Sequence, residues 1–342
     1  MTKMDELMKE VNKQFNEEVL TLGLPSYDYT RIPFTSPRMN YCTFGGLPVG
    51  KITEFFGKEY SGKTTSALDI VANYQHMQNE KKVLYVDAEN KLNISWAKKL
   101  GVDIDDIYIL QPKEESAEEI FETIYKVVNT GEIGLWVLDS IGVLLSQQEW
   151  EKEMSEKTYG GVSMPLTKFG KKIIGPMARN KCTGIGINQL RDDMNSMWGG
   201  TRTPGGRGWK FNCSVRLEFN QGKFLDEKGN ELTRSAEQPA GNIVQMSMVK
   251  NSTCPPSRRL GQYRIMYDYG IDYIGDLIDV AIKYDIIDKH GAWFTIIDIE
   301  TGDVLEDKIQ GQANLQEYLQ NDENIKILKR VEELVDNEMK KD

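Results

Sequence analysis

The segment that most restricts the fold of this chain is the run GKEYSGKTT at positions 57–65, which fits the spacing GxxxxGK[ST]. An apolar run at 52–56 precedes it and a helical pattern at about 63–79 follows, which is the strand–turn–helix setting that this motif requires. Glycines let backbone amides approach an anion closely, and the N-terminus of a helix adds a favourable dipole. The run therefore predicts a phosphate-binding loop made of Gly57, Lys58, Glu59, Tyr60, Ser61, Gly62, Lys63, Thr64 and Thr65.

Carboxylates that follow two further apolar runs complete the expected site. Asp139 ends the run LWVLD, so we expect its side chain at the carboxyl edge of a sheet, beside the phosphate loop. There Asp139 and the Thr64 hydroxyl would hold Mg²⁺, while Lys63 would reach the β- and γ-phosphates of the nucleotide. Glu89 follows the run VLYVD and would orient the water that attacks the γ-phosphate. A surface helix cap is the alternative interpretation of Glu89.

Apolar runs and amphipathic helical patterns alternate through the middle of the chain. We expect strands at 52–56, 83–86, 107–110, 135–138 and 184–187, and helices at 63–79, 94–100, 117–129 and 165–180. This alternation predicts an α/β fold with a mainly parallel central sheet covered on both faces. Runs at 215–219 and 244–249 predict later strands, which we expect to be antiparallel.

The two ends of the chain have a different pattern. Residues 1–25 predict an amphipathic helix, and a stretch rich in Ser, Thr, Tyr and Pro at 25–37 predicts a connector. After position 274 we expect a helix at 276–284, a hairpin at 293–299 that turns at 300–303, and helices at 313–319 and 324–337. We therefore divide the chain into an N-terminal helix and linker (1–35), a core (36–272) and a small α+β domain (273–342).

Composition excludes several classes of protein. The 342 residues include no apolar run of about 18 or more, so the sequence predicts no membrane span, and it shows no secretory signal. Four widely spaced cysteines and two histidines argue against a structural zinc site or a disulfide framework. Both observations predict a cytoplasmic protein. A net charge of −10 leaves nucleic-acid binding open, because a local basic loop can still bind phosphates.

Taken together, several segments resemble the RecA family. They are GGLPVGKITEFFGKEYSGKTT, VLYVDAEN, WAKKLGVDIDDIYILQP, LWVLDSIGVL, INQLR, PGGRGWKFNCSVRLE, MVKN, GIDYIGDLIDVAIKYDIIDKHGAWF and GQAN. The resemblance runs in order from about residue 40 to the end of the chain. It implies a RecA-like P-loop ATPase core, and a recombinase that uses ATP to pair and exchange DNA strands in recombination and repair. The N-terminal helix then corresponds to an arm that packs on a neighbouring subunit.

The resemblance also implies roles for individual residues of the nucleotide site. Glu89 matches the family's water-activating glutamate, and Trp96 matches an aromatic residue that stacks on adenine. Tyr267 is a second candidate wall of the adenine pocket, and Asn93 would lie near the edge of the base. Gln189, which ends the run at 184–187, matches a residue that senses the γ-phosphate and couples it to the loop that binds DNA.

That loop runs from about 190 to 208, and a first loop at about 150–161 is expected to flank the DNA. Glycine amides and arginines can bind phosphates, and Met or Trp side chains can stack on bases of any sequence. The second loop could instead be a mobile lid. Lys168, Lys171 and Lys172, on the helix after the first loop, could instead form a solvated helix face. The expected DNA-binding residues are Tyr159, Lys168, Lys171, Lys172, Arg191, Met194, Met197, Trp198, Arg202, Gly205, Gly206 and Arg207.

This sequence departs from the family's pattern at two places. The family has two lysines, spaced Lys-Asn-Lys, that reach from one subunit into its neighbour's ATP site, whereas this chain has Lys250-Asn251-Ser252. We expect Lys250 to stabilise charge on the γ-phosphate across the interface, helped by Arg258 or Arg259. The acidic pair Asp192-Asp193 lies in the expected DNA loop. Together with the divergent N-terminal quarter, these departures fit a phage-encoded or accessory recombinase as well as a cellular one.

The principal expectation is thus a DNA-dependent ATPase that forms helical filaments on single-stranded DNA and pairs it with duplex DNA. ATP and Mg²⁺ are the expected cofactors, and proteins that bind single-stranded DNA or load recombinases are further candidate partners. One alternative is a recombinase paralogue or mediator that binds ATP and DNA but regulates another recombinase. Another is a hexameric helicase motor, although such motors usually carry a separate N-terminal domain and only some 35–40 residues precede the core here.

Overall fold

The computed structural model of the chain describes residues 2–15, 20–21, 30–77, 80–153, 160–192, 200–233, 235–255 and 257–341. The chain divides into two compact units, Met1–Thr30 and Arg31–Asp342. No helix within the described ranges is both long and apolar enough to cross a membrane.

Among the described residues of the first unit there is one helix, α1 (Lys3–Phe15). Asp5 and Glu6 lie in its first turn and Lys13 in its last, which suits the dipole of the helix. None of its residues is buried, and its apolar residues Met4, Leu7 and Phe15 are exposed. This helix therefore carries apolar residues that the described part of its unit leaves exposed.

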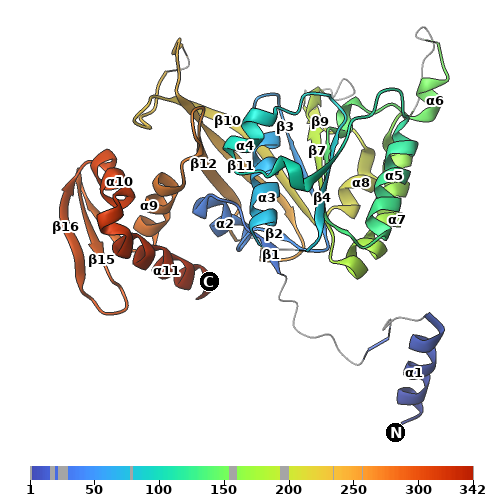
Figure 1. Ribbon diagram of the computed structural model, residues 1–342, viewed down its shortest axis with the longest axis horizontal. Helices are drawn as coiled ribbons and strands as arrows, with labels where there is room; N and C mark the ends of the chain where they lie inside the picture. Colours follow the sequence, from blue (N-terminus) through green and yellow to red (C-terminus); the bar gives the residue numbers. More distant parts are fainter. Residues whose placement is uncertain are drawn as a thin grey trace. The chain divides into compact units, whose positions relative to one another are not determined.

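A nine-stranded sheet forms the centre of the second unit (Figure 1). The strand order is β13-β12-β11-β10-β3-β7-β6-β4-β5, and all pairs from β10 to β5 are parallel. The α/β fold with a mainly parallel sheet is thus confirmed. The strands are β3 (Ile52–Gly57), β4 (Lys82–Asp87), β5 (Ile107–Leu110), β6 (Ile133–Asp139), β7 (Thr183–Gln189), β10 (Val215–Leu225), β11 (Gly241–Asn251), β12 (Leu260–Met266) and β13 (Gly270–Ile271).

Successive residues of the central strands enter two different hydrophobic cores. Val83 and Tyr85 of β4 belong to one core, and Leu84 and Val86 of the same strand belong to the other. Both faces of a parallel sheet must be covered, and the continuous apolar runs of the sequence follow from that requirement. Helices α3 (Lys63–His76) and α4 (Ile94–Lys99) lie beside the first core, and α5 (Ala117–Asn129), α7 (Ser163–Asn180) and α8 (Gly206–Asn212) lie beside the second (Figure 1).

Local signals fix where these helices begin. At α5 the side chain of Ser116 accepts a hydrogen bond from the amide of Glu119, whose carboxylate accepts one from the amide of Ser116 in return. This reciprocal pair satisfies two backbone donors that the first turn leaves unpaired.

The core also contains the short helix α6 (Gln147–Trp150) and the 3₁₀ segments η1 (Ile104–Asp106) and η2 (Ile141–Val143).

The stretch before the phosphate loop is more regular than the sequence predicts. It contains β1 (Arg31–Ile32), α2 (Pro37–Thr43) and β2 (Leu47–Pro48), and β1 pairs with β2 in a small antiparallel sheet. Ser36 caps α2, a proline stands in its first turn, and the helix ends at Phe44, whose φ is 56°. Helix α2 packs against β12 and against the C-terminal lobe.

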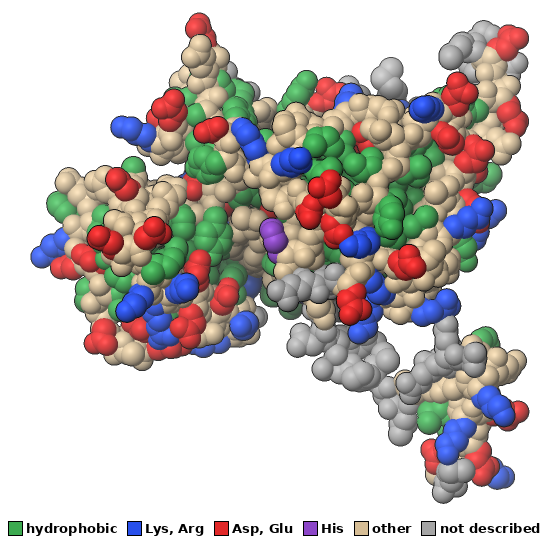
Figure 2. Space-filling model, in the orientation of Figure 1, with side chains coloured by type: hydrophobic (Ala, Val, Ile, Leu, Met, Phe, Trp, Pro, Cys, Tyr) green, Lys and Arg blue, Asp and Glu red, His purple; other side chains and the backbone are tan. Residues whose placement is uncertain are grey.

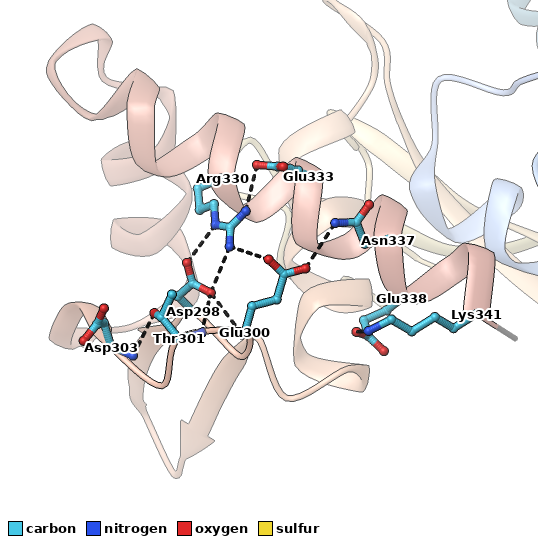
Figure 3. A network of polar contacts seen from close by, with 9 residues as sticks. All are labelled: Asp298, Glu300, Thr301, Asp303, Arg330, Glu333, Asn337, Glu338 and Lys341. Atoms are coloured by element: carbon cyan, nitrogen blue, oxygen red, sulfur yellow. Dashed lines mark hydrogen bonds and ion pairs between the residues drawn. The ribbon is translucent and has the colours of Figure 1, made fainter.

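The C-terminal lobe is α+β, with its own hydrophobic core. Arg330 of its last helix donates hydrogen bonds to Asp298 at 2.7 Å and to Glu300 at 2.7 Å, both in the turn between its last two strands (Figure 3). This network ties the last helix to the turn of the hairpin. The elements are α9 (Tyr273–Lys283), β14 (Ile287–His290), β15 (Trp293–Ile297), β16 (Val304–Gln310), α10 (Gln312–Gln320), η3 (Asp322–Asn324) and α11 (Ile325–Lys341).

Charged groups join this lobe to the core. Asp279 of α9 pairs with Arg38 of α2 at 2.6 Å and with Arg264 of β12 at 3.2 Å. On the face seen in Figure 2, acidic and basic side chains are interspersed over the C-terminal lobe.

Most differences from the predicted elements concern the second half of the chain. Strands β12 and β14 were not predicted, and the strand expected at 215–219 extends to Leu225. That strand was also expected to be antiparallel, but β10 is parallel to β3 and antiparallel only to β11. The change from parallel to antiparallel pairing therefore occurs one strand later than expected, between β10 and β11.

Candidate active site and nucleic-acid interface

Four strands of the parallel sheet end side by side and bring their last residues to one edge. Gly57 of β3 is in register with Gln189 of β7, and Asp87 of β4 is in register with Asp139 of β6. Ligands of open α/β sheets bind outside the carboxyl ends of the strands, where such residues meet. The phosphate loop and the predicted carboxylates therefore lie at a single edge.

The phosphate loop requires its glycines. A Cβ atom on Gly57 would lie 2.1 Å from the carbonyl oxygen of Phe219, so no larger residue fits there. Gly62 precedes the first residue of α3 with a φ of 91°, a left-handed conformation that favours glycine. Helix α3 thus begins with its amides directed at the loop, as a phosphate site requires.

Lys63 follows Gly62 and is held within the loop. Its ammonium donates hydrogen bonds to the carbonyl oxygen of Lys58 at 2.6 Å and to Oγ of Ser61 at 3.3 Å. Burial lowers the pKa of Lys63 below its usual value, while nearby Asp139 and Glu89 oppose that change. A cation held in this way is placed to reach the outer phosphates of a nucleotide.

Thr64 and Asp139 meet as the sequence predicts. The Thr64 hydroxyl donates to Oδ2 of Asp139 at 2.8 Å, and the hydroxyl of Tyr85 donates to the same oxygen at 2.9 Å. Burial raises the pKa of Asp139, and these hydrogen bonds partly offset that effect. A hydroxyl and a carboxylate are the oxygen ligands that Mg²⁺ takes alongside phosphate oxygens and water, so this pair fits that ion. Tyr85 was not predicted as part of the site.

Glu89 lies in a turn directly after β4 and receives hydrogen bonds from three side chains. Ser140 Oγ donates to Oε1 at 2.5 Å and Gln189 Nε2 donates to the same oxygen at 2.9 Å. Lys91 Nζ donates to Oε2 at 2.9 Å. Burial raises the pKa of Glu89, but these hydrogen bonds outweigh burial, and the net pKa lies below the usual value. Glu89 is therefore a carboxylate at neutral pH, as a base for water requires.

The expected base-binding residues line a cavity of about 840 Å³ next to the phosphate loop. Trp96 Nε1 donates to Oγ1 of Thr65 at 3.2 Å, which fixes the indole ring beside the loop. Asn93 caps α4 by accepting a hydrogen bond from the amide of Trp96 at 3.0 Å. Tyr267 reaches the cavity from the loop after β12 and donates to Asn242 at 3.0 Å. Further lining residues that sequence reasoning missed are Gln221, Phe224, Asn242 and Ile265.

The segment expected to bind DNA begins where β7 ends. A short antiparallel ribbon, β8 (Arg191–Asp192) and β9 (Thr201–Arg202), pairs Arg191 with Arg202. Arg191 also donates to the carbonyl oxygen of Gly142 at 2.5 Å. The second loop was expected to run to about 208, but α8 already begins at Gly206, after Gly205 as its cap. Gly206 and Arg207 are therefore helical residues, and the side chains of Arg191, Arg202 and Arg207 are exposed.

Four expected DNA-binding residues lie outside the described ranges, namely Tyr159, Met194, Met197 and Trp198.

The three expected lysines of α7, Lys168, Lys171 and Lys172, are all exposed. Lys172 pairs with Glu122 of α5 at 3.2 Å and lies 4.5 Å from the centre of the Tyr125 ring. Lys168 and Lys172 line a small cavity together with the acids Glu118 and Glu122. The acids of α5 therefore offset part of the positive charge of this face.

Lys250 of β11 makes contacts within its own chain. Its ammonium donates to the carbonyl oxygens of Lys210, Phe211 and Cys213, at 3.0, 3.1 and 2.6 Å. These carbonyls end α8, and a cation at the C-terminus of a helix is favourable. Arg258, proposed as a helper of Lys250, is only 8 % exposed and lies 4.1 Å from the centre of the Tyr41 ring. It does not project from the surface.

The strand order, the phosphate loop and the carboxylates at the ends of β4 and β6 define the protein as a P-loop ATPase. Comparison of the sequence narrows this class. The model of the RecA N-terminal domain matches residues 2–272 and that of the RecA C-terminal domain matches residues 275–340. The chain belongs to the RecA family.

Individual relatives agree with this assignment. Protein RecA of Clostridium perfringens (strain SM101 / Type A) is 36% identical over 282 residues, which are 82% of this chain and 74% of that protein. Protein RecA of Clostridium acetobutylicum is 34% identical over 334 residues, which are 96% of this chain and 89% of that protein. The chain is thus a RecA-type recombinase and a DNA-dependent ATPase, which binds ATP and DNA and associates with copies of itself.

Proposed function

We propose that this chain polymerises as a helical filament on single-stranded DNA, with ATP held between neighbouring subunits, and exchanges the bound strand with a homologous duplex. The observation that carries this proposal is the 2.9 Å hydrogen bond from Gln189 to Glu89. Glu89 belongs to the hydrolytic edge, and Gln189 is the last residue before the segment that leads into the β8–β9 ribbon. The Gln189 side chain would therefore link the site of ATP hydrolysis to the proposed DNA-binding ribbon.

In the proposed hydrolysis, Glu89 orients and deprotonates the attacking water, and Lys63 stabilises negative charge on the outer phosphates. Thr64 and Asp139 hold Mg²⁺, which neutralises phosphate charge when it is bound. Residues 57–65 hold the phosphates through their amides. Gln189 would respond to the γ-phosphate through Glu89, because its amide donates a hydrogen bond to Glu89 Oε1.

The adenine base is proposed to lie in the cavity beside the loop. Trp96 stacks on one face of the base and Tyr267 forms a second wall, while Asn93 lies at the rim. An aromatic ring fixed by a hydrogen bond, as Trp96 is to Thr65, provides a stacking surface with little loss of side-chain freedom.

The β8–β9 ribbon and the start of α8 are proposed to bind the DNA strand. Arg191, Arg202 and Arg207 would bind phosphates, and the amides of Gly205 and Gly206 would add donors. Met194, Met197 and Trp198 would stack on bases, with Tyr159 in the first loop. Lys168, Lys171 and Lys172 are proposed to extend this basic surface along α7.

Residues 1–35, 36–272 and 273–342 are proposed to have separate functions. The exposed apolar face of α1, formed by Met4, Leu7 and Phe15, suits an arm that packs on a neighbouring subunit. The core would carry the nucleotide and DNA sites, and the C-terminal lobe would form a separate small α+β domain. Lys250 is proposed to act on the neighbour's γ-phosphate in the filament. Since the proposed substrate is DNA and the relatives are bacterial, we propose the cytoplasm as the place of action.

Electron microscopy of the negatively stained protein tests the filament. With a non-hydrolysable ATP analogue and single-stranded DNA, continuous helical filaments are expected, and closed rings or lone monomers would contradict the proposal. A strand-exchange assay on the same material separates a recombinase from a mediator. Filaments that form but exchange no strands would favour the mediator.

A further inference from the structure

We propose that Lys91 is a positioning residue for ATP hydrolysis, which holds the Glu89 carboxylate so that one oxygen faces the attacking water. This inference rests on the proposed role of Glu89 as the base. It assigns a function to a residue outside the phosphate loop and outside the strands that end at the site.

The backbone that carries Lys91 is fixed by a buried carboxylate. Asp87 is 2 % exposed; its Oδ1 accepts a hydrogen bond from the amide of Lys91 at 3.0 Å and its Oδ2 accepts one from the amide of Leu92 at 3.0 Å. Gln111 of the segment after β5 donates to the same Oδ2 at 3.2 Å. The turn between Asp87 and Leu92 is thus anchored at both ends, which fixes the backbone that carries Glu89 and Lys91.

The hydrogen bonds to Glu89 make its two carboxylate oxygens unequal. Each carboxylate oxygen can accept about two hydrogen bonds. Oε1 already accepts from Ser140 and Gln189, so it has no site left for water. Oε2 accepts only the Lys91 ammonium among the donors described, at 2.9 Å. One acceptor site therefore remains on Oε2, and the contact with Lys91 decides where that site points.

The carboxylate of Glu89 has acidic neighbours, so a cation that pairs with it helps to hold its orientation. The cavity in front of Glu89 is also lined by Glu59, Asp87 and Asp139, and Lys63 and Lys91 are the described cations that line it. Lys63 is bound to the loop carbonyl of Lys58, so it is not available to orient Glu89. Of these two described cations, Lys91 is the one that pairs directly with Glu89.

The exposure of the pair separates this role from a structural one. The Lys91 side chain is 76 % exposed, whereas that of Glu89 is 13 % exposed. Exposed ion pairs contribute little to the stability of a fold. Replacement of Lys91 should therefore leave the fold intact and change only the geometry of Glu89.

The test compares Lys91→Met, which keeps most of the stem but removes the charge, with Lys91→Arg, which keeps the charge. Steady-state hydrolysis is measured with saturating single-stranded DNA. For Lys91→Met we expect kcat to fall roughly three- to thirtyfold, less than the roughly 10²- to 10⁴-fold contribution of a general base because Glu89 itself is kept, while KM for ATP changes by less than about twofold. Lys91→Arg should recover most of the lost kcat. A matched control is Lys82→Met, which removes the exposed pair with Asp106 at the opposite end of β4 and should leave kcat unchanged.

The outcomes separate the role of Lys91 from the role of Glu89. If Glu89→Gln abolishes hydrolysis but Lys91→Met keeps the full kcat, the inference about Lys91 is wrong. If Lys91→Met raises KM and leaves kcat unchanged, Lys91 binds nucleotide and does not position Glu89, which also overturns the inference. If Glu89→Gln itself keeps full activity, the proposed role of Glu89 fails instead. Circular dichroism of Lys91→Met should match the wild type, and a loss of structure would show a structural role.

Discussion

Gln189 Nε2 donates a hydrogen bond of 2.9 Å to Oε1 of Glu89, although 100 residues separate the two in the sequence. The contact exists because β7 and β4 both end at the same edge of the sheet, with β6 between them. Gln189 is followed by Leu190 and then by the β8–β9 ribbon. We therefore predict that a change at the γ-phosphate that moves Glu89 is transmitted through Gln189 to the segment proposed to bind DNA.

Replacement of Gln189 should uncouple the two sites. In Gln189→Leu we expect hydrolysis without DNA to stay within about threefold of wild type, because Glu89 keeps its contacts with Ser140 and Lys91. Stimulation by single-stranded DNA should be mostly lost. The measurement is the ratio of kcat with and without DNA, with Gln245→Leu at an exposed position of β11 as control. Full stimulation in Gln189→Leu would show that coupling takes another route.

Trp96 is predicted to provide stacking energy for the adenine base. Removal of one aromatic partner costs about 0.5–1.5 kcal/mol, so Trp96→Ala should weaken binding of ATP about two- to tenfold. Trp96→Phe should restore most of the affinity, although it lacks the hydrogen bond to Thr65. Titration with a fluorescent ATP analogue measures both. Equal affinity of wild type and Trp96→Ala would place the base elsewhere.

Arg202 is predicted to bind a DNA phosphate. Loss of one such contact should lower affinity for single-stranded DNA and reduce the slope of log K against log salt by about 0.7. Arg202 is exposed on the ribbon, so Arg202→Ala is the variant to test. Fluorescence anisotropy over a series of salt concentrations measures the slope. An unchanged slope would remove Arg202 from the interface.

Lys250 is predicted to act across the subunit interface in the filament, although it caps α8 within its own chain. Lys250→Ala should therefore lose most DNA-stimulated ATPase activity. A mixture of Lys250→Ala and Glu89→Gln subunits separates the contact across the interface from the contact with α8. In this mixture a Glu89→Gln subunit can place its Lys250 in the site of a neighbour that has Glu89. If Lys250 acts across the interface, an equal mixture of the two inactive variants should recover about a quarter of wild-type activity. No recovery would mean that Lys250 acts only by holding α8.

Asp69 of α3 is predicted to make stability depend on pH. It is 1 % exposed, and burial raises its pKa to about 6, against the hydrogen bonds from Thr35 and Asn73. The folded state therefore holds a proton that the unfolded state, with a pKa of 3.8, has already released, and stability falls as the pH rises from about 4 to 7. The loss from this group is about 3 kcal/mol.

The variant Asp69→Asn removes that contribution. Its unfolding free energy relative to wild type should rise by about 3 kcal/mol between pH 4 and pH 8, because only the wild type must bury a charge at the higher pH. Urea denaturation at several pH values measures the difference. Parallel curves for the two proteins would show that Asp69 has an ordinary pKa.

Much of the nucleotide site could be predicted because its signals are local. The glycines at 57 and 62, the lysine that begins α3, and the carboxylates after two apolar runs can all be recognised in short windows of sequence. Parallel strands place such residues at a common edge, so Asp139 and Thr64 could be expected to meet. The 2.8 Å hydrogen bond between them agrees with that expectation.

Other parts depend on contacts between distant segments. Ser140 and Lys91 bind Glu89 only because β6 lies beside β4 and Asp87 fixes the turn, and neither residue carries a signal of its own. The cap that Lys250 places on α8 joins residues about 40 positions apart. Helix α2 did carry a signal, a capping serine followed by proline, but its seven residues are too few to show helical periodicity.

The central claim is that the nucleotide site and the DNA site form one coupled system. The most direct test is the affinity of the protein for single-stranded DNA, measured with and without a saturating non-hydrolysable ATP analogue. We predict that the analogue tightens DNA binding by roughly 5- to 150-fold, and that DNA tightens binding of the analogue by the same factor. Equal DNA affinity in the presence and absence of the analogue would contradict the account.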